Sequence, residues 1–333
     1  MVDKPKFKEV RVQDAVGMVL PHDMTQILPG VFKGRLFKKG HVVTEADIEP
    51  LLSIGKDHIY ILDMPPGCIH ENEAGERIAK AVAGEGLSHS EPYEGKVTLK
   101  AKFKGVVKIN ETAVHAINEL DAIALSTVLT NRVVEEGHSV AATRIIPLII
   151  QEERIAELEK LAQSFAGPIV QVLPLPAKKA GIVTTGSEVF KGRIADKFGP
   201  AVRAKVEALG SSVVEQRFAP DDKTLIQQEI RYLLDQGVDL VLVTGGMSVD
   251  PDDKTPGAIA GVATEIVRYG TPMLPGSMLM VAYKDETPIL GLPGAVMHEK
   301  FTSFDVFLPR ILLGERITEK DITSLGYGGL LNC

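Results

Sequence analysis

The stretch from Val238 to Ile259 constrains the fold more than any other part of the chain. Its first six residues, Val238 to Val243, form an almost unbroken apolar run rich in β-branched side chains, which predicts a strand buried on both faces. The run ends at Thr244-Gly245-Gly246, and a polar, acidic loop leads to Thr255-Pro256. This is a typical helix start, with Thr255 expected as the cap and Pro256 as the first helical residue. In open α/β sheets ligands bind beyond the carboxyl ends of the strands. The stretch therefore predicts a buried parallel strand followed by a ligand-binding loop.

Strand and helix patterns alternate on both sides of this stretch, as a doubly wound sheet requires. One helix is expected to end at Gly210 and another at Gly237, since glycine commonly terminates helices. The chain after residue 176 thus predicts a three-layer α/β domain with a mostly parallel sheet. The expected strands are Ala180 to Thr184, Ser212 to Phe218, Ala263 to Tyr269, Leu279 to Tyr283 and Pro288 to Leu290, and a last helix is expected to run through Val296, Phe301, Phe304 and Leu308.

The first half of the chain predicts a β-rich α+β region. Apolar and polar residues alternate from Val97 to Phe103, as in a half-buried antiparallel strand, and helices are expected over 70–84 and 152–165. The clearest break in composition is Pro174-Leu175-Pro176, because extended proline-containing backbone separates cores. We therefore expect three segments: an N-terminal α+β segment (1–90), a small β-rich module (91–176) and the α/β domain (177–333).

His70 and Glu71 open the first of these helices and have two interpretations. They could contribute to a metal or acid–base site. However, acids are favoured at a helix N-terminus by the helix dipole, and no HExxH motif is present. The sequence favours the structural interpretation.

The composition of the chain limits which class of protein it can be and which ligands it can bind. A net charge of -7 argues against general nucleic-acid binding but leaves room for a small anionic ligand held by local amides and cations. Cys68 and Cys333 lack metal-ligand spacing. No charged-then-apolar leader opens the chain, and no apolar run reaches the roughly 18 residues that a membrane span needs. We expect a cytoplasmic protein without membrane or nucleic-acid partners.

The glycine turns do not match the common nucleotide-binding motifs. Gly181 and Gly186 have the spacing of a P-loop, but Ser187-Glu188 replaces the required Lys-Ser/Thr, and GxGxxG is absent. Carboxylates instead accompany three glycine turns at strand ends, and they could hold Mg²⁺ against a phosphorylated ligand. Asp196 and Asp222 can equally be helix caps, so both roles stay open for them. The carboxylates are Glu188, Asp196, Asp222, Asp250 and Asp253.

Five motifs in this half resemble the molybdopterin-binding domain of the molybdenum-cofactor biosynthesis proteins, which include molybdopterin molybdotransferase, molybdopterin adenylyltransferase and gephyrin. The order and spacing of the motifs carry the resemblance, which covers about residues 178 to 310. The motifs are TTGSE (184–188), GRIAD (192–196), PDD (220–222), TGGMSVDPDDKTP (244–256) and GLPG (291–294).

The resemblance implies binding of molybdopterin or of its adenylylated form, and in molybdotransferases Mg²⁺-dependent insertion of molybdate with release of AMP. It places Asp253 near the metal or molybdate and Glu188 in the first loop of the site. Because none of the three has an evident structural role, we expect catalysis and metal binding from Glu188, Asp250 and Asp253. The resemblance implies that the ligand lies against the loops that contain Thr185, Gly186, Ser187, Asp196, Asp222, Thr244, Gly245, Gly246, Ser248, Pro293 and Gly294. It also implies a homodimer, with a molybdoenzyme or another assembly protein as a further partner.

Several positions depart from the family pattern and keep other functions open. Lys197-Phe198 replaces the usual Ser-Asn, Asp250 stands where glycine is usual, and Ala295 to His298 replaces Asn-Pro-Val-Ser. The primary expectation is a divergent, molybdotransferase-like enzyme. The first alternative is a non-catalytic cofactor carrier or sensor, and a weaker one is a nucleotide pyrophosphatase of the competence-damage type.

Overall fold

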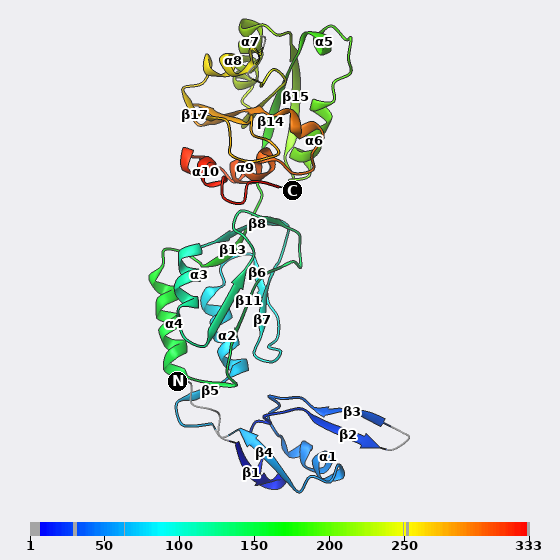
Figure 1. Cartoon of the computed structure of the whole chain (residues 1–333), viewed down its shortest axis with the longest axis vertical. Helices are drawn as coiled ribbons and strands as arrows, with labels where there is room; N and C mark the ends of the chain where they lie inside the picture. Colours follow the sequence, from blue (N-terminus) through cyan, green and yellow to red (C-terminus); the bar gives the residue numbers. More distant parts are fainter. Residues whose placement is uncertain (1–6, 29–31, 63, 249, 251–252, 332–333) are drawn as a thin grey trace. The chain divides into compact units, whose positions relative to one another are not determined.

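The computed structural model describes residues 7–28, 32–62, 64–248, 250 and 253–331, and Cys333 lies outside them. The chain forms two compact units, Met1–Leu173 and Pro174–Cys333 (Figure 1). Within the described residues, no helix combines the length and the apolar character needed to cross a membrane.

The C-terminal unit is built on a six-stranded sheet with the order β15-β14-β16-β19-β18-β17. The first four strands in this order are parallel, and β18 and β17 are added to the edge in antiparallel pairs. This arrangement confirms the expected α/β domain. The strands are β14 (Lys179–Thr185), β15 (Ser212–Ala219), β16 (Leu240–Thr244), β17 (Glu265–Tyr269), β18 (Met280–Lys284) and β19 (Thr287–Leu292).

Strand β16 is buried on both faces, as its apolar run predicts. Leu240 and Leu242 pack in one core with α6 and α9, whereas Val241 and Val243 pack in a second core with α7 and α8. Helices therefore cover both faces and complete three layers. The helices are α5 (Ser187–Phe190), α6 (Phe198–Glu207), α7 (Lys223–Asp235), α8 (Thr255–Ala260), α9 (Ser303–Leu312) and α10 (Glu319–Ser324), with a 3-10 turn, η3, over Gly294–Met297.

Two helix starts differ from the sequence-based expectation. Thr255 is the first residue of α8, and Lys254 takes the N-cap position without a side-chain capping bond. The last helix begins at Ser303, well after η3, because Thr302 and Asp305 form a capping box. A local capping pair thus determines where this helix starts, and the expected continuous helix through Val296 is wrong.

The N-terminal unit is β-rich, as expected, and contains several small sheets. The larger ones have the orders β6-β7-β11-β9 and β10-β8-β13, and two-stranded sheets pair β1 with β4, β2 with β3 and β5 with β12. The strands are β1 (Phe7–Arg11), β2 (Met24–Leu28), β3 (Phe32–Phe37), β4 (His58–Leu62), β5 (Cys68–His70), β6 (Leu87–His89), β7 (Val97–Ala101), β8 (Gly105–Ile109), β9 (Ile123–Thr127), β10 (Val133–Val134), β11 (Ser139–Ile145), β12 (Ile149–Gln151) and β13 (Val170–Pro174). The helices are α1 (Ile48–Ser53), α2 (Glu71–Val82), α3 (Glu111–Asn118) and α4 (Glu152–Ser164), with 3-10 turns η1 (Val12–Asp14) and η2 (Glu45–Asp47).

Two cores organise this unit. One joins buried residues between Val12 and Ile61, and the other joins residues from Ile69 to Val172. The second core continues across residue 90, where the sequence suggested a division, because α2 packs against β7 and β11. Arg77 of α2 also donates two hydrogen bonds of 2.9 Å to Glu159 of α4.

Candidate functional site

The loops with the predicted site residues follow three neighbouring strands of the C-terminal sheet. Thr184 at the end of β14 is in register with Thr244 at the end of β16, and Thr244 is in register with Leu292 at the end of β19. Because these strands are parallel, their carboxyl ends form one edge. The structure thus brings Gly186, the Gly245-Gly246 pair and the Pro293-Gly294 pair to the same edge of the sheet.

Gly245 and Gly246 hold two of these loops in direct contact. Both have positive φ angles, 88° and 54°, which L side chains rarely adopt. A Cβ atom on Gly245 would lie 2.5 Å from the carbonyl oxygen of Thr185, and one on Gly246 would lie 3.0 Å from Oγ1 of Thr255. Only glycine fits at position 245. The backbones of the loops that follow β14 and β16 therefore approach each other without side chains between them.

Buried hydroxyl groups connect the strand ends beneath the loops. The Oγ1 atoms of Thr185 and Thr255 lie 3.2 Å apart, and the Thr244 hydroxyl donates to that of Thr184 over 3.3 Å. All four residues are buried. Thr244 and Thr185 therefore serve first to fix the loops, and Thr255, to which the sequence assigned a capping role, is part of the same network.

Asp196 has a structural role that accounts for both of its carboxylate oxygens. The side chain accepts hydrogen bonds from the amides of Phe198 and Gly199 at the start of α6, and Gln216 donates to its Oδ2 over 2.6 Å. The same amide nitrogen of Gln216 also donates to Thr184 over 2.9 Å. Gln216 links the α6 start to the strand ends, and no motif in the sequence marks it.

Asp222 caps α7, since its side chain accepts from the amide of Leu225 over 3.0 Å. The neighbouring Asp221, which lies in the PDD motif, does not cap the helix but accepts from the amide of Ser187 over 2.8 Å. In return Ser187 Oγ accepts from the amide of Asp221. The Ser187 amide is thus bonded to protein, and this loop is held by Asp221. Ser187 and Asp221 each lie in one of the five motifs, but nothing in the sequence predicted that they contact each other.

The three remaining acids do not form a ready metal site. Glu188 and Asp250 are exposed, and Asp253 is half-buried, with its amide donating to the carbonyl of Asp250. Across the part of the chain that the structure describes, no three His, Cys, Asp or Glu side chains are grouped closely enough to hold a metal ion. These carboxylates by themselves therefore do not define a Mg²⁺ site.

Tyr269 fixes the glycine-rich loop from the far edge strand. The phenol donates to the carbonyl of Met247 over 2.7 Å, and the Ser248 carbonyl lies 3.4 Å away. Burial raises the pKa of Tyr269, and the negative charge of Asp253 raises it further. The residue is therefore a neutral donor beside Asp253. Sequence reasoning missed it because β17 reaches this edge only through the topology of the sheet.

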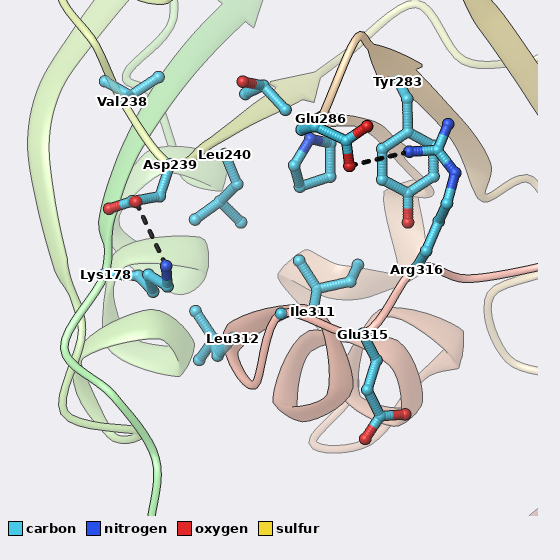
Figure 2. A pocket seen from close by; sticks show the side chains of 13 residues that line it. Lys178, Val238, Asp239, Leu240, Tyr283, Glu286, Ile311, Leu312, Glu315 and Arg316 are labelled. Carbon is cyan, nitrogen blue, oxygen red and sulfur yellow. Dashed lines mark hydrogen bonds and ion pairs between the residues drawn. The ribbon is translucent and has the colours of Figure 1, made fainter.

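A cavity of about 270 Å³ lies at the opposite edge, where the parallel strands begin (Figure 2). Its charged lining residues are paired: Lys178 with Asp239 at 3.4 Å, Arg316 with Glu286 at 3.5 Å, and Glu315 with Arg310. The Arg316 guanidinium also stacks on Tyr283, 4.2 Å from the ring centre. Its ionic groups are thus already satisfied, and the carboxyl edge remains the candidate site.

Comparison with known families agrees with this location. Residues 181–313 match the family described as "Probable molybdopterin binding domain", and residues 9–63 match a domain of unknown function, DUF8806. The matched stretch contains all five motifs. Residues 181–313 therefore form a domain of the molybdopterin-binding type.

Individual relatives match over shorter stretches. The chain is 38% identical over 88 residues to a CinA-like protein of Mycobacterium avium, which is 26% of this chain and 20% of the relative. It is 35% identical over 82 residues to a CinA-like protein of Mycobacterium tuberculosis H37Rv, or 25% of this chain and 19% of the relative. The matches thus span about a fifth of the length of these relatives.

Two solved structures are similar to part of the chain. The molybdopterin biosynthesis enzyme MoaB of Thermus thermophilus is similar with a TM-score of 0.36 and 25% identity, covering 41% of this chain and 96% of that one. The protein CinA of Thermoplasma acidophilum, described as of unknown function, has a TM-score of 0.36 and 18% identity, covering 40% and 98%.

Proposed function

We propose that the C-terminal unit binds molybdopterin, or its adenylylated form, at the carboxyl edge of its sheet, and that the protein acts in molybdenum-cofactor biosynthesis. The contact between Gly245 and Thr185 carries this proposal most directly. It keeps side chains out of the space between two loops at strand ends, where backbone amides can approach a phosphate. The match of residues 181–313 to the molybdopterin-binding family supports the same ligand.

We further propose a molybdotransferase-like activity, in which adenylylated molybdopterin and molybdate react with Mg²⁺-dependent release of AMP. Asp253 is the acid best placed to act, because it is half-buried and lies close to Gly246, whose Cβ position is 3.5 Å from Oδ1. Glu188 and Asp250 are exposed at the rim. Mg²⁺ supplies positive charge against phosphate oxygens, and with this donor set those oxygens and water would have to provide most of its ligands.

A non-catalytic carrier or sensor is the second candidate, and one observation favours it. The loops depart from the family pattern at Lys197-Phe198, Asp250 and Ala295 to His298, whereas the glycine contacts that favour ligand binding are present. A domain that still binds the ligand but no longer catalyses the reaction would show this combination. The two candidates differ in one measurable product, AMP.

The experiment is anaerobic incubation of the full chain with adenylylated molybdopterin, molybdate and Mg²⁺, with AMP as the readout. The enzyme predicts AMP release that requires both molybdate and Mg²⁺ and falls about tenfold or more in Asp253→Ala. The control Asp235→Asn changes an exposed acid at the end of α7 and should release AMP at the wild-type rate. Unchanged turnover in Asp253→Ala would remove Asp253 from the site, and tight binding without AMP would establish the carrier.

The remaining alternatives are tested in the same preparation. Nucleotide pyrophosphatase activity predicts hydrolysis of ADP-ribose without molybdate. The proposed homodimer predicts twice the chain mass of 35.9 kDa in sedimentation. A stable monomer would contradict the dimer without affecting the ligand assignment.

A further inference from the structure

Two neighbouring ionisable residues in the N-terminal unit, the half-buried His70 and the buried Glu71, each have a buried polar atom without a hydrogen-bond partner. His70 Nε2 and Glu71 Oε1 have no hydrogen-bond partner within the described residues, and the Glu71 side chain is only 2% exposed. Buried polar groups in native proteins are almost always bonded, so exceptions mark strain or function. These two residues lie at the start of α2, far in sequence from the candidate ligand site.

The two unpartnered atoms face the same point above Gly40. A Cβ atom on Gly40 would lie 3.5 Å from His70 Nε2 and 3.5 Å from Glu71 Oε1. Nδ1 of His70 accepts from the amide of Asn72 over 3.2 Å, which places the proton of the neutral ring on Nε2. Gly40 belongs to the turn of residues 38–40 after β3, which we call the covering turn.

A second turn, formed by residues 93–95, covers the other side of Glu71. Gly95 has a φ of +70°, and a Cβ there would lie 2.9 Å from Cβ and 3.0 Å from Oε2 of Glu71. The covering turn contacts this second turn, since Lys38 Nζ lies 4.5 Å from the centre of the Tyr93 ring. Segments from the two cores of the unit therefore meet over one carboxyl group.

The charged side chains around His70 and Glu71 compensate poorly for a charge on either residue. Arg144 of β11 is 4.0 Å from Glu71 Oε2, and Lys39 of the covering turn and Glu94 of the second turn act at longer range. Burial raises the pKa of Glu71, against the lowering effects of Lys39 and Arg144. Burial lowers the pKa of His70, and Lys39 lowers it further. Contact of the covering turn with His70 and Glu71 is thus compatible with neutral forms of both side chains.

We propose that the covering turn is a proton-controlled contact, which closes over His70 and Glu71 when both are neutral and opens when either is charged. Opening separates the covering turn from the start of α2, while Val19 and Leu62 keep their packing against Leu148. Glu73, in the first turn of α2, is exposed and provides a control acid outside this contact.

The two residues respond to pH in opposite directions. The raised pKa of Glu71 means that closure is favoured below the ordinary carboxyl value of 4.5 and is lost as pH rises through the raised value. The lowered pKa of His70 means that closure is favoured above 6.5 and is lost as pH falls through the lowered value. Each residue alone can change the open-to-closed ratio by up to about tenfold per pH unit.

The experiment uses ¹⁹F NMR of the full chain labelled with fluorotyrosine between about pH 4 and 7.5. The chain has 6 tyrosines, and Tyr93→Phe assigns the signal that reports whether Lys38 covers the ring. His70→Gln, which leaves Glu71 alone, should open as pH rises. Glu71→Gln, which leaves His70 alone, should open as pH falls. The double variant should be independent of pH, and Glu73→Gln should follow the wild type.

The other tyrosine signals report whether each variant is folded. The same pH profile in the two single variants, or no pH response in either, would overturn the proposal. Slopes opposite to those expected would also overturn it, since they would show that the closed state holds a charged ion pair.

Discussion

The side chains of Thr185 and Thr255 meet beneath the glycine loop, with their Oγ1 atoms 3.2 Å apart. Thr185 ends β14 and Thr255 begins α8, so this bond joins the first and second loops of the site. Thr255, which the local sequence pattern predicts to cap a helix, instead makes a contact between segments that are distant in the sequence. The bond holds the end of β14 against the start of α8 before any ligand arrives, which lowers the cost of ordering these two segments on binding.

Thr255→Val should remove this bond at nearly constant volume. We expect the free energy of unfolding of the C-terminal unit to fall by about 1–3 kcal/mol, because the buried Thr185 hydroxyl loses its partner. Calorimetry of the full chain measures the change. Thr323→Val, at an exposed threonine in α10, should have a much smaller effect, and equal effects would contradict the role of the pair.

Gly245→Ala and Gly192→Ala form a matched pair of substitutions at positive φ. Gly192 has a φ of +68° with nothing within 4 Å of its Cβ position, so alanine adds only backbone strain, about 1 kcal/mol. At Gly245 the Cβ would also lie 2.7 Å from Thr185 Oγ1, which forces the loops apart. Gly245→Ala should therefore destabilise the unit clearly more than Gly192→Ala in the same melts. Similar losses would mean that the contact with Thr185 is easily relieved.

Tyr269→Phe removes the hydrogen bond to the Met247 carbonyl and keeps the ring. The loss of one bond worth about 1 kcal/mol predicts roughly fivefold weaker binding of molybdopterin. The control is Tyr327→Phe, at a fully exposed residue, which should bind like the wild type. Unchanged affinity in Tyr269→Phe would show that the loop holds its shape without this bond.

The pair of Arg77 and Glu159 predicts a dependence of stability on pH. Hydrogen bonds from Arg77 hold the pKa of Glu159 below its ordinary value of 4.5. The stabilisation is therefore present above pH 4.5 and is lost as pH falls through the lowered value. Glu159→Gln should cost about 1 kcal/mol at pH 7 and less in acid, since the pair is partly exposed to solvent. Glu157→Gln, in a surface pair with Arg154, is the control; an equal cost at all pH values would contradict the linkage.

Much of the fold follows from local patterns in the sequence. The spacing of Val202 and Val206 before Gly210 predicts α6, and the apolar run after Val238 predicts β16. These elements are predictable because burial on one helix face or on both strand faces leaves a periodic trace. The start of α9 was not predicted, since the capping box of Thr302 and Asp305 interrupts an apolar pattern that continues across it.

The site was predictable only where residues lie in the loops that carry the motifs. Gly245 and Gly246 are marked by their position after a strand. Gln216 and Tyr269 lie outside the motifs, and each acts through a contact that the fold creates. Asp221 lies in the PDD motif, but its contact with Ser187 could not be predicted from it. The roles of Asp196 and Asp222 as helix caps were one of two sequence interpretations, and their bonds to backbone amides support it. Their direct contact with a ligand stays a prediction.

The most direct test of the account is an anaerobic titration of molybdopterin into the full chain and into Gly245→Ala and Gly192→Ala. We expect one saturable site per chain. Its affinity should be about tenfold or more weaker in Gly245→Ala and unchanged in Gly192→Ala, since only the first substitution separates the loops at the carboxyl edge. An absence of saturable binding by the wild-type chain would contradict the proposed ligand. Equal affinity in all three proteins would place the ligand elsewhere.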